Sequence, residues 1–297
     1  MNIADIKVVG IIGAGQMGSG IAQVAASAGF RTLLTDRSED LAVRAKQKIG
    51  AILEKQVAKG KMSDAAREQT LARLEPLGGV ASLAAADFVI EAATENLELK
   101  LAILRDADAA LKKGAILASN TSSISITKLA GATQRPALVI GMHFMNPVPV
   151  MKLVEIVRAI QTSPETYETT RALATTFGKT VIGSKDQPAF VVNRMLVPFL
   201  NEACFAVQEG LASPDDIDQG ARLGLNHPMG PLELADFIGL DTLLAITEVL
   251  HRDFGDDKYR PAVLLRNLVA AGWLGKKSGR GFYAYDEKGE KQRSTIA

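Results

Sequence analysis

KVVGIIGAGQMG, residues Lys7 to Gly18, joins a short apolar run to a loop that contains three glycines. The run Lys7–Ile12 predicts a buried strand, and the small and apolar residues of Gln16–Ala28 predict a helix directly after the loop. A G-x-G-x-x-G loop between a strand and a helix is typical of dinucleotide-binding domains. This stretch therefore predicts an α/β domain of the Rossmann type.

The glycines and an acidic residue further on indicate the ligand. Gly13 permits a tight turn, Gly15 lets the backbone approach a pyrophosphate, and Gly18 lets the helix pack closely on the sheet. The helix N-terminus offers N–H groups and positive potential to phosphates. Asp36 follows Gly13 by 23 residues and can bind both ribose hydroxyls, so NAD is favoured over NADP, although Arg37 leaves room for some NADP use. The alternative is a glycine-rich turn without a ligand. The predicted cofactor contacts here are Gly13, Ala14, Gly15, Gln16, Met17, Gly18 and Asp36.

Strand-like and helix-like segments alternate through the first half of the chain, which favours a mainly parallel sheet with helices on both faces. The segment 39–75 is long for a crossover, and we expect it to form a helical hairpin that projects from the sheet. The expected strands after the first are Arg31–Asp36, Phe88–Ala92, Ala115–Ser119 and Leu138–His143.

Polar and turn-forming residues at Ser184–Pro188 (SKDQP) interrupt this pattern, and beyond them only helical patterns follow. We therefore expect a Rossmann-type NAD-binding domain over 1–185 and an all-α domain over 186–297. The expected helices of the second domain are Val191–Glu209, Asp215–Leu223, Pro231–Arg252 and Tyr259–Ala271.

The composition is that of an ordinary globular protein, with 47% hydrophobic and 23% charged residues among 297. A formal net charge of +1 gives no general attraction to nucleic acid or to an anionic membrane. The single cysteine, Cys204, excludes an intrachain disulfide and is expected to be a small buried apolar side chain. No apolar run approaches the roughly 18 residues of a membrane span, and only six residues precede the first strand-like run. These features predict a soluble, cytoplasmic protein. The three histidines are 84 and 24 residues apart, a spacing that does not suggest a metal site.

Polar residues follow several expected strands at the edge where open α/β sheets bind ligands. Glu95 and Lys100 come after the strand that ends in VIEA, and we expect both to contact the cofactor, with a solvated helix start as the alternative. Ser122 lies in the segment Asn120–Ser123 after the next strand, where hydroxyls either face the substrate or cap a helix.

His143 ends another strand at the same edge, and Glu155 follows 12 residues later across a turn with two prolines. An imidazole beside a nicotinamide is the usual base for a hydroxyl proton. A carboxylate at its far nitrogen would fix the tautomer and stabilise the imidazolium. The alternative is a satisfied core histidine. Asn146, between the two, is expected to hold the cofactor or a substrate oxygen.

The chain resembles the 3-hydroxyacyl-CoA dehydrogenases over about Val8–Tyr285. The motifs that carry the resemblance are IGAGQMGSGIAQV, SNTSSISI, HFMNPVPVMKLVEIV, PAFVVNRML, NHPMGPLELADFIGLD and KKSGRGFYAYD. The resemblance is greatest to the short bacterial 3-hydroxybutyryl-CoA dehydrogenases. It implies NAD-linked oxidation of (S)-3-hydroxyacyl-CoA to 3-oxoacyl-CoA in fatty-acid or butanoate metabolism.

The resemblance also assigns roles to residues. It implies a catalytic pair of His143 and Glu155, with Ser122 and Asn193 at the reacting oxygen. The cofactor contacts that it implies beyond the glycine loop and Asp36 are Glu95, Lys100, Ser122, Asn146 and Lys277. Without the resemblance, Asn201 and Asn226 would be equal candidates to Asn193.

Lysines along the helix 39–61 are candidates for holding the phosphates of coenzyme A. Lys55 and Lys59 are the expected contacts, and Lys59 aligns with a family lysine, whereas Ile52 replaces a family serine. The other candidates are Lys46, Lys48 and Lys61. A merely solvated helix face is the alternative for each of them.

Apolar stripes in the second half, such as Leu196, Val197, Phe199 and Leu200, exceed what one small bundle buries, and the resemblance implies a homodimer through these helices. Two other functions are considered. One is a related dehydrogenase of a free hydroxy or sugar acid, of the gulonate type. The other is a crystallin-like protein that binds NAD without turnover.

Overall fold

The computed structural model describes residues 2–296, and the chain divides into two compact units, Met1–Phe190 and Val191–Ala297. Each unit is described by itself. Within residues 2–296, no helix has both the length and the apolar character needed to cross a membrane.

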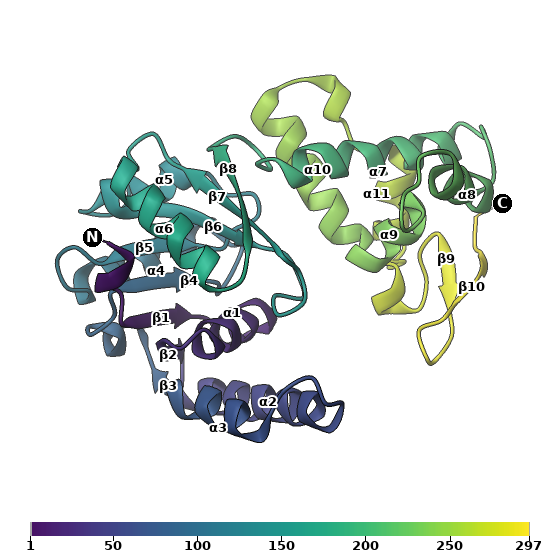
Figure 1. The fold of residues 1–297 in the computed structure, drawn as a ribbon. Coiled ribbons are helices and arrows are strands. Elements are labelled where there is room, and N and C mark those ends of the chain that lie inside the picture. The colour runs from purple at the N-terminus through teal and green to yellow at the C-terminus, as the bar shows by residue number, and fades with distance from the viewer. Residues whose placement is uncertain (1, 297) are drawn as a thin grey trace. The chain divides into compact units, whose positions relative to one another are not determined.

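The first unit is built on an eight-stranded sheet in the order β3-β2-β1-β4-β5-β6-β7-β8 (Figure 1). Each strand runs parallel to its neighbour across β3, β2, β1, β4, β5 and β6. In contrast, β7 is antiparallel to β6 and parallel to β8. This confirms the predicted mainly parallel sheet. The strands are β1 Val8–Ile12, β2 Arg31–Asp36, β3 Leu74–Gly78, β4 Phe88–Glu91, β5 Ile116–Ser119, β6 Val139–Phe144, β7 Leu153–Arg158 and β8 Thr180–Lys185.

Helices cover both faces of this sheet, because alternate strand residues are apolar on each side. Val9 and Ile11 of β1 pack in one core cluster with α1, α2 and α6, and Ile12 packs in a second cluster with α4 and α5. The α-helices of this unit are α1 Gln16–Ser27, α2 Glu39–Ala58, α3 Asp64–Arg73, α4 Leu97–Ala110, α5 Ile126–Ala130 and α6 Pro164–Thr176; short 3₁₀ turns are η1 Ile3–Asp5, η2 Val80–Leu83 and η3 Pro136–Leu138.

The helical hairpin expected over 39–75 is present as α2 and α3, which lie side by side next to β3 (Figure 1). Beyond it the chain returns to the sheet as β3, which pairs with β2 and which the sequence did not predict. Pro76 lies within this strand and conceals it, because a proline usually argues against a strand. The position is tolerated because β3 is an edge strand, where one side of the strand needs no N–H donor.

The second unit is mainly helical, as predicted, but it also contains a two-stranded antiparallel hairpin of β9 and β10. The single helix expected over Pro231–Arg252 is two helices, because Gly239 breaks it with φ of 102°. Cys204 is fully buried, which confirms the expectation for it. The elements are α7 Val192–Gln208, α8 Pro214–Gly224, α9 Pro231–Ile238, α10 Leu240–Phe254, η4 Asp257–Tyr259, α11 Val263–Ala270, η5 Lys276–Ser278, β9 Tyr283–Tyr285 and β10 Lys291–Ser294.

Candidate active site

The glycine loop lies between β1 and α1, and its three glycines have different surroundings. Gly13 has φ of 104°, and a Cβ there would lie 2.6 Å from the carbonyl oxygen of Ala92. A Cβ at Gly18 would lie 1.8 Å from the carbonyl oxygen of Gly13. A Cβ at Gly15, in contrast, would meet nothing within 4 Å. The loop is therefore closed against the sheet at both ends and open in the middle, where a pyrophosphate would approach the backbone.

Asp36 ends β2 beside this loop. Its carboxylate accepts hydrogen bonds from the amides of Ala14 (2.7 Å) and Arg37 (2.8 Å). Two carboxylate oxygens offer about four acceptor positions, so capacity remains for ribose hydroxyls. Gly15 precedes α1 as its N-cap without a side-chain hydrogen bond, and the positive end of the helix dipole therefore faces the loop. These residues fit an NAD molecule.

His143 and Glu155 are direct partners in the antiparallel register of β6 and β7. The Nδ1 of the imidazole lies 2.7 Å from Oε2 of the carboxylate, and the two residues are 7% and 0% exposed. Since Nδ1 faces an acceptor, the arrangement favours a proton on Nδ1 and a lone pair on Nε2. Within residues 2–296, no hydrogen bond occupies Nε2. The pair can thus accept or donate a proton through Nε2.

The strand periodicity decides which way His143 faces. Met142 and Phe144 enter one core cluster, so His143 lies on the opposite face of β6, at its carboxyl end. There its ring contacts Phe190 edge-on, with centroids 5.8 Å apart. The amide of Phe144 donates to Oδ1 of Asn120 (2.9 Å), which ties the end of β6 to the segment after β5.

Glu95 and Ser122, which follow β4 and β5, are brought together. The Glu95 carboxylate accepts hydrogen bonds from Thr121 Oγ1 (2.6 Å), the Ser122 amide (2.8 Å) and Ser122 Oγ (3.1 Å). The alternative of helix capping does not apply to Ser122, because Ser125 caps α5. Ser122 Oγ donates to Glu95 and keeps its lone pairs for a ligand.

Lys100 pairs with a buried acid, and its expected contact with the cofactor stays a prediction. It is 1% exposed, and its Nζ lies 2.5 Å from Oε2 of Glu91, which also accepts from Ser119 Oγ (2.7 Å). Glu91 accepts the Ala93 amide as well (2.9 Å). Lys100 and Glu91 therefore brace the ends of β4 and β5 from inside. We had no prediction for Glu91, although an acid at the end of the apolar run FVIE (Phe88–Glu91) was a signal for it.

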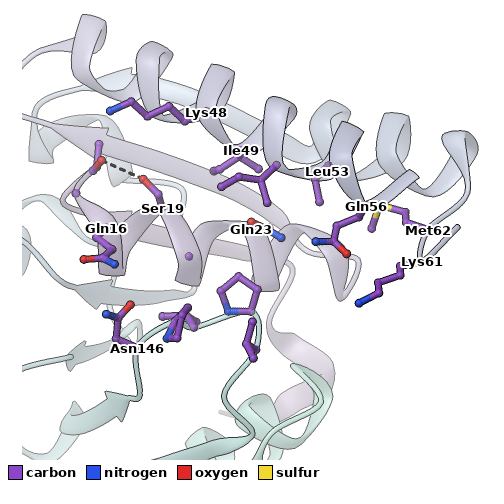
Figure 2. Close-up of a pocket in the computed structure, with 18 residues that line it drawn as sticks. Gln16, Ser19, Gln23, Lys48, Ile49, Leu53, Gln56, Lys61, Met62 and Asn146 are labelled. Carbon is purple, nitrogen blue, oxygen red and sulfur yellow. Dashed lines mark hydrogen bonds between the residues drawn. The ribbon is translucent and has the colours of Figure 1, made fainter. Parts of the chain in front are cut away.

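A pocket with a volume of about 710 Å³ lies between α1, α2 and the turn after β6 (Figure 2). Gln16 and Asn146 lie at one end of it, and Lys61 and Met62 at the other. Its walls are largely apolar, and His143 is not among its lining residues. The other residues that line the pocket are Ala14, Gly15, Ser19, Gly20, Gln23, Lys48, Ile49, Ile52, Leu53, Gln56, Pro147, Val148, Pro149 and Val150. The pocket therefore suits the body of an elongated ligand rather than its reacting carbon.

The lysines of the α2 region do not all reach this pocket. Lys48 and Lys61 line it, whereas Lys55 and Lys59 are exposed and are not among its lining residues. Lys46 donates to the carbonyl of Leu74 (2.7 Å) and so ties α2 to β3.

Two predicted site residues belong to the second unit. Asn193 is the second residue of α7 and does not cap it, because the N-cap is Val191. Asn201, the other candidate in α7, is 3% exposed. Its side chain donates to the carbonyl of Arg260 and accepts from the amide of Ala262, so Asn201 has a structural role. The ammonium of Lys277 pairs with Asp241 at 2.5 Å. The catalytic role of Asn193 and the cofactor contact of Lys277 stay predictions.

The fold and the glycine loop define an NAD-binding dehydrogenase. Two family models match: "3-hydroxyacyl-CoA dehydrogenase, NAD binding domain" over residues 8–187 and "3-hydroxyacyl-CoA dehydrogenase, C-terminal domain" over residues 190–285. The chain belongs to the 3-hydroxyacyl-CoA dehydrogenase family, and its cofactor is NAD.

Relatives over nearly the whole chain support this assignment. The chain is 51% identical to 3-hydroxybutyryl-CoA dehydrogenase of Bradyrhizobium diazoefficiens, over 95% of this chain and 96% of the relative. It is 44% identical to the enzyme of that name from Mycobacterium tuberculosis, over 94% and 99%. The crystal structure of (S)-3-hydroxybutyryl-CoA dehydrogenase from Ralstonia eutropha matches with a TM-score of 0.93 and 50% identity, over 95% of this chain and 100% of that one.

Proposed function

We propose that this enzyme interconverts (S)-3-hydroxybutyryl-CoA and acetoacetyl-CoA, with His143 and Glu155 as the catalytic pair. The proposal rests above all on the contact of 2.7 Å between the imidazole Nδ1 and the Glu155 carboxylate. The names of the relatives support the short acyl chain and the (S) configuration.

In the oxidising direction, Nε2 of His143 removes the proton from the substrate hydroxyl. Glu155 stabilises the imidazolium that results, because a carboxylate next to a charged ring lowers the free energy of the charged form. NAD held at the glycine loop and Asp36 would supply the acceptor for the hydride of the carbinol carbon. In the reverse direction Nε2 returns the proton to the ketone oxygen, and Ser122 and Asn193 are proposed to hold that oxygen.

The pocket between α1, α2 and the turn after β6 is proposed to hold the coenzyme A part of the substrate along α2 and Lys61, while its end at Gly15, Gln16 and Asn146 is left to the cofactor. Its apolar walls suit the pantetheine chain, and the ammonium groups of Lys48 and Lys61 suit phosphates. Lys55 and Lys59 remain proposed contacts at the exposed side of α2. A free hydroxy acid would leave this pocket empty, so a preference for acyl-CoA over a free acid separates this proposal from the gulonate-type alternative.

The direct test is reduction of acetoacetyl-CoA with NADH by the His143→Gln variant. Removal of the only proposed base should lower kcat by about 10² to 10⁴, while the KM for NADH changes little. His251→Gln is the matched control, because His251 is a half-buried histidine of the second unit that pairs with Asp257. Turnover by His143→Gln within a few-fold of the wild type would disprove the assignment of the base. Binding of NADH without turnover by the wild type would favour the crystallin-like alternative.

A further inference from the structure

Lys179 lies at the end of α6, just before β8, and only 8% of its surface is exposed. Its amide donates to the carbonyl of Ala174 (3.1 Å), and the Gly178 amide donates to the carbonyl of Thr175 (2.9 Å). Together with φ of 74° at Gly178, these bonds form a Schellman motif. The motif fixes the backbone from which the lysine side chain projects.

The Lys179 ammonium contacts the segment Pro147–Met151, which we name the pocket-wall turn. It donates to the carbonyls of Val148 (2.5 Å) and Met151 (2.8 Å). The amides of Val150 and Met151 both donate to the Pro147 carbonyl at 3.0 Å, so this segment forms a single helical turn. Carbonyls at the end of such a turn have no partner inside it, and the ammonium supplies one. Burial lowers the pKa of Lys179, because the charged form loses hydration there.

The other side of the pocket-wall turn faces the pocket, and the residues from Pro147 to Val150 line it. Val148 is 2% exposed and packs on α1, where a Cβ added at Gly20 would lie 2.8 Å from the Val148 Cβ. Val148 is thus held through its carbonyl by Lys179 and through its side chain by α1. These two contacts together set how far the wall stands from α1.

We propose that Lys179 is a positioning residue for the acyl-CoA substrate. It fixes the pocket-wall turn from behind, so that the pocket keeps the width that binds the coenzyme A part. The inference rests on the proposed function, because that proposal assigns the pocket to coenzyme A. Lys179 does not line the pocket; it acts through Val148 and Met151.

Lys179→Met tests this, because it removes the ammonium and keeps a long apolar side chain. We expect the KM for acetoacetyl-CoA to rise about tenfold, with kcat within about twofold, because the lost binding is the same in the ground and transition states. The KM for NADH should change less than the KM for acetoacetyl-CoA, because the predicted cofactor contacts lie only at the Gln16 and Asn146 end of the pocket. Lys152→Met is the matched control: it removes the same charge from an exposed side chain at the end of the turn and should change no constant by more than about twofold.

Hydrogen exchange gives a second measurement that does not depend on activity. The amides of Val150 and Met151 should exchange at least about tenfold faster in Lys179→Met and at the wild-type rate in Lys152→Met. Lys179→Arg keeps a charged donor and should bring the KM back to within about threefold of the wild type. If Lys179→Met does not fold, Lys179→Gln, which removes the charge and keeps a neutral NH₂ donor group, takes its place in both measurements.

An unchanged KM together with unchanged exchange of these two amides would overturn the proposal. So would equal effects of the Lys179 and Lys152 substitutions, because general attraction of the substrate phosphates would then explain both. Failure of the wild type to reduce acetoacetyl-CoA would overturn the proposed function, and the exchange rates would still decide whether Lys179 fixes the turn.

Discussion

At the scale of a single residue, Asp36 holds the glycine loop through its carboxylate, and we expect the same carboxylate to bind ribose. It accepts the amides of Ala14 and Arg37, and its negative charge would repel a 2′-phosphate. Asp36→Ala should therefore lower kcat/KM for NADH by about tenfold or more and reduce the preference for NADH over NADPH, with Arg37 free to meet the phosphate. Asp40→Ala, at an exposed acid in the first turn of α2, is the control. An unchanged ratio of kcat/KM for the two cofactors would contradict the role of Asp36.

Contacts between particular side chains could be predicted from the sequence only where the sheet fixes the positions of both residues. The pairing of His143 with Glu155 was predicted, because neighbouring strands bring these side chains together. The contact of Glu95 with Ser122 was not predicted, although both residues were expected at the same edge of the sheet. Lys100 was different, since the sequence does not show that a lysine will turn inward to a buried acid such as Glu91. The lysines near the pocket could not be ranked either, because the turn after α2 decides that Lys61 faces it.

At the scale of elements, the β9–β10 hairpin docks on α9 through a buried acid. Asp236 is fully buried and accepts the amides of Phe282 (3.0 Å) and Tyr283 (2.9 Å) and the Tyr285 hydroxyl (3.1 Å). Burial raises the pKa of Asp236 to about 6, against these hydrogen bonds, which lower it. In the neighbouring contact Asp218 of α8 accepts the first amides of α9 and the Tyr283 hydroxyl.

This raised pKa predicts a pH dependence of stability. The folded protein binds the Asp236 proton more tightly than the unfolded chain does. The protonated carboxyl therefore contributes to the free energy of unfolding fully below about pH 4, and this contribution is lost as the pH rises through about 6. Relative to Asp236→Asn, the free energy of unfolding of the wild type should fall by up to about 3 kcal/mol between pH 4 and pH 7. Urea unfolding measures it, with Glu287→Gln at an exposed acid as the control. A difference between wild type and Asp236→Asn that is constant with pH would contradict it.

Helices and strands could be predicted from the sequence where the apolar pattern of the segment matches its burial in the fold. β1, α1 and β2 have both an apolar period and turn residues at their ends. The edge strand β3 was concealed by Pro76, and β8 is only half-buried along most of its length, so neither has a clear apolar period. The break between α9 and α10 depends on the backbone of Gly239, and an isolated glycine does not always end a helix.

At the scale of the whole molecule, the second unit carries several large apolar side chains at its surface. The stripe residues Val197 and Leu200 are in its core. Other large side chains are exposed instead, namely Met195, Leu211, Leu223, Leu225, Phe237 and Val263. The family resemblance implies that helices of this unit form an interface with a second copy of this chain, and these exposed side chains are the candidates for it.

We therefore expect a homodimer, whose molar mass in sedimentation equilibrium is twice the 31.6 kDa of one chain. The double variant Leu223→Asp/Phe237→Asp should shift the protein to monomer, because it places charges in an apolar interface. Ile160→Asp, at a residue of the first unit that is 88% exposed, should leave the dimer intact. A wild type that is monomeric at micromolar concentration would contradict this expectation.

The pairing of His143 with Glu155 in the β6–β7 ladder has a consequence for how this enzyme can change over generations. Residues that are opposite each other in an antiparallel ladder point to the same face of the sheet. If one strand shifts by one residue along its partner, its side chains turn to the other face. Deletion of one codon within either strand would thus separate acid from base, although every chemical group is still encoded. Length changes confined to the connection between the strands would spare the pair, and lineages of this enzyme should accumulate insertions there and not in the ladder.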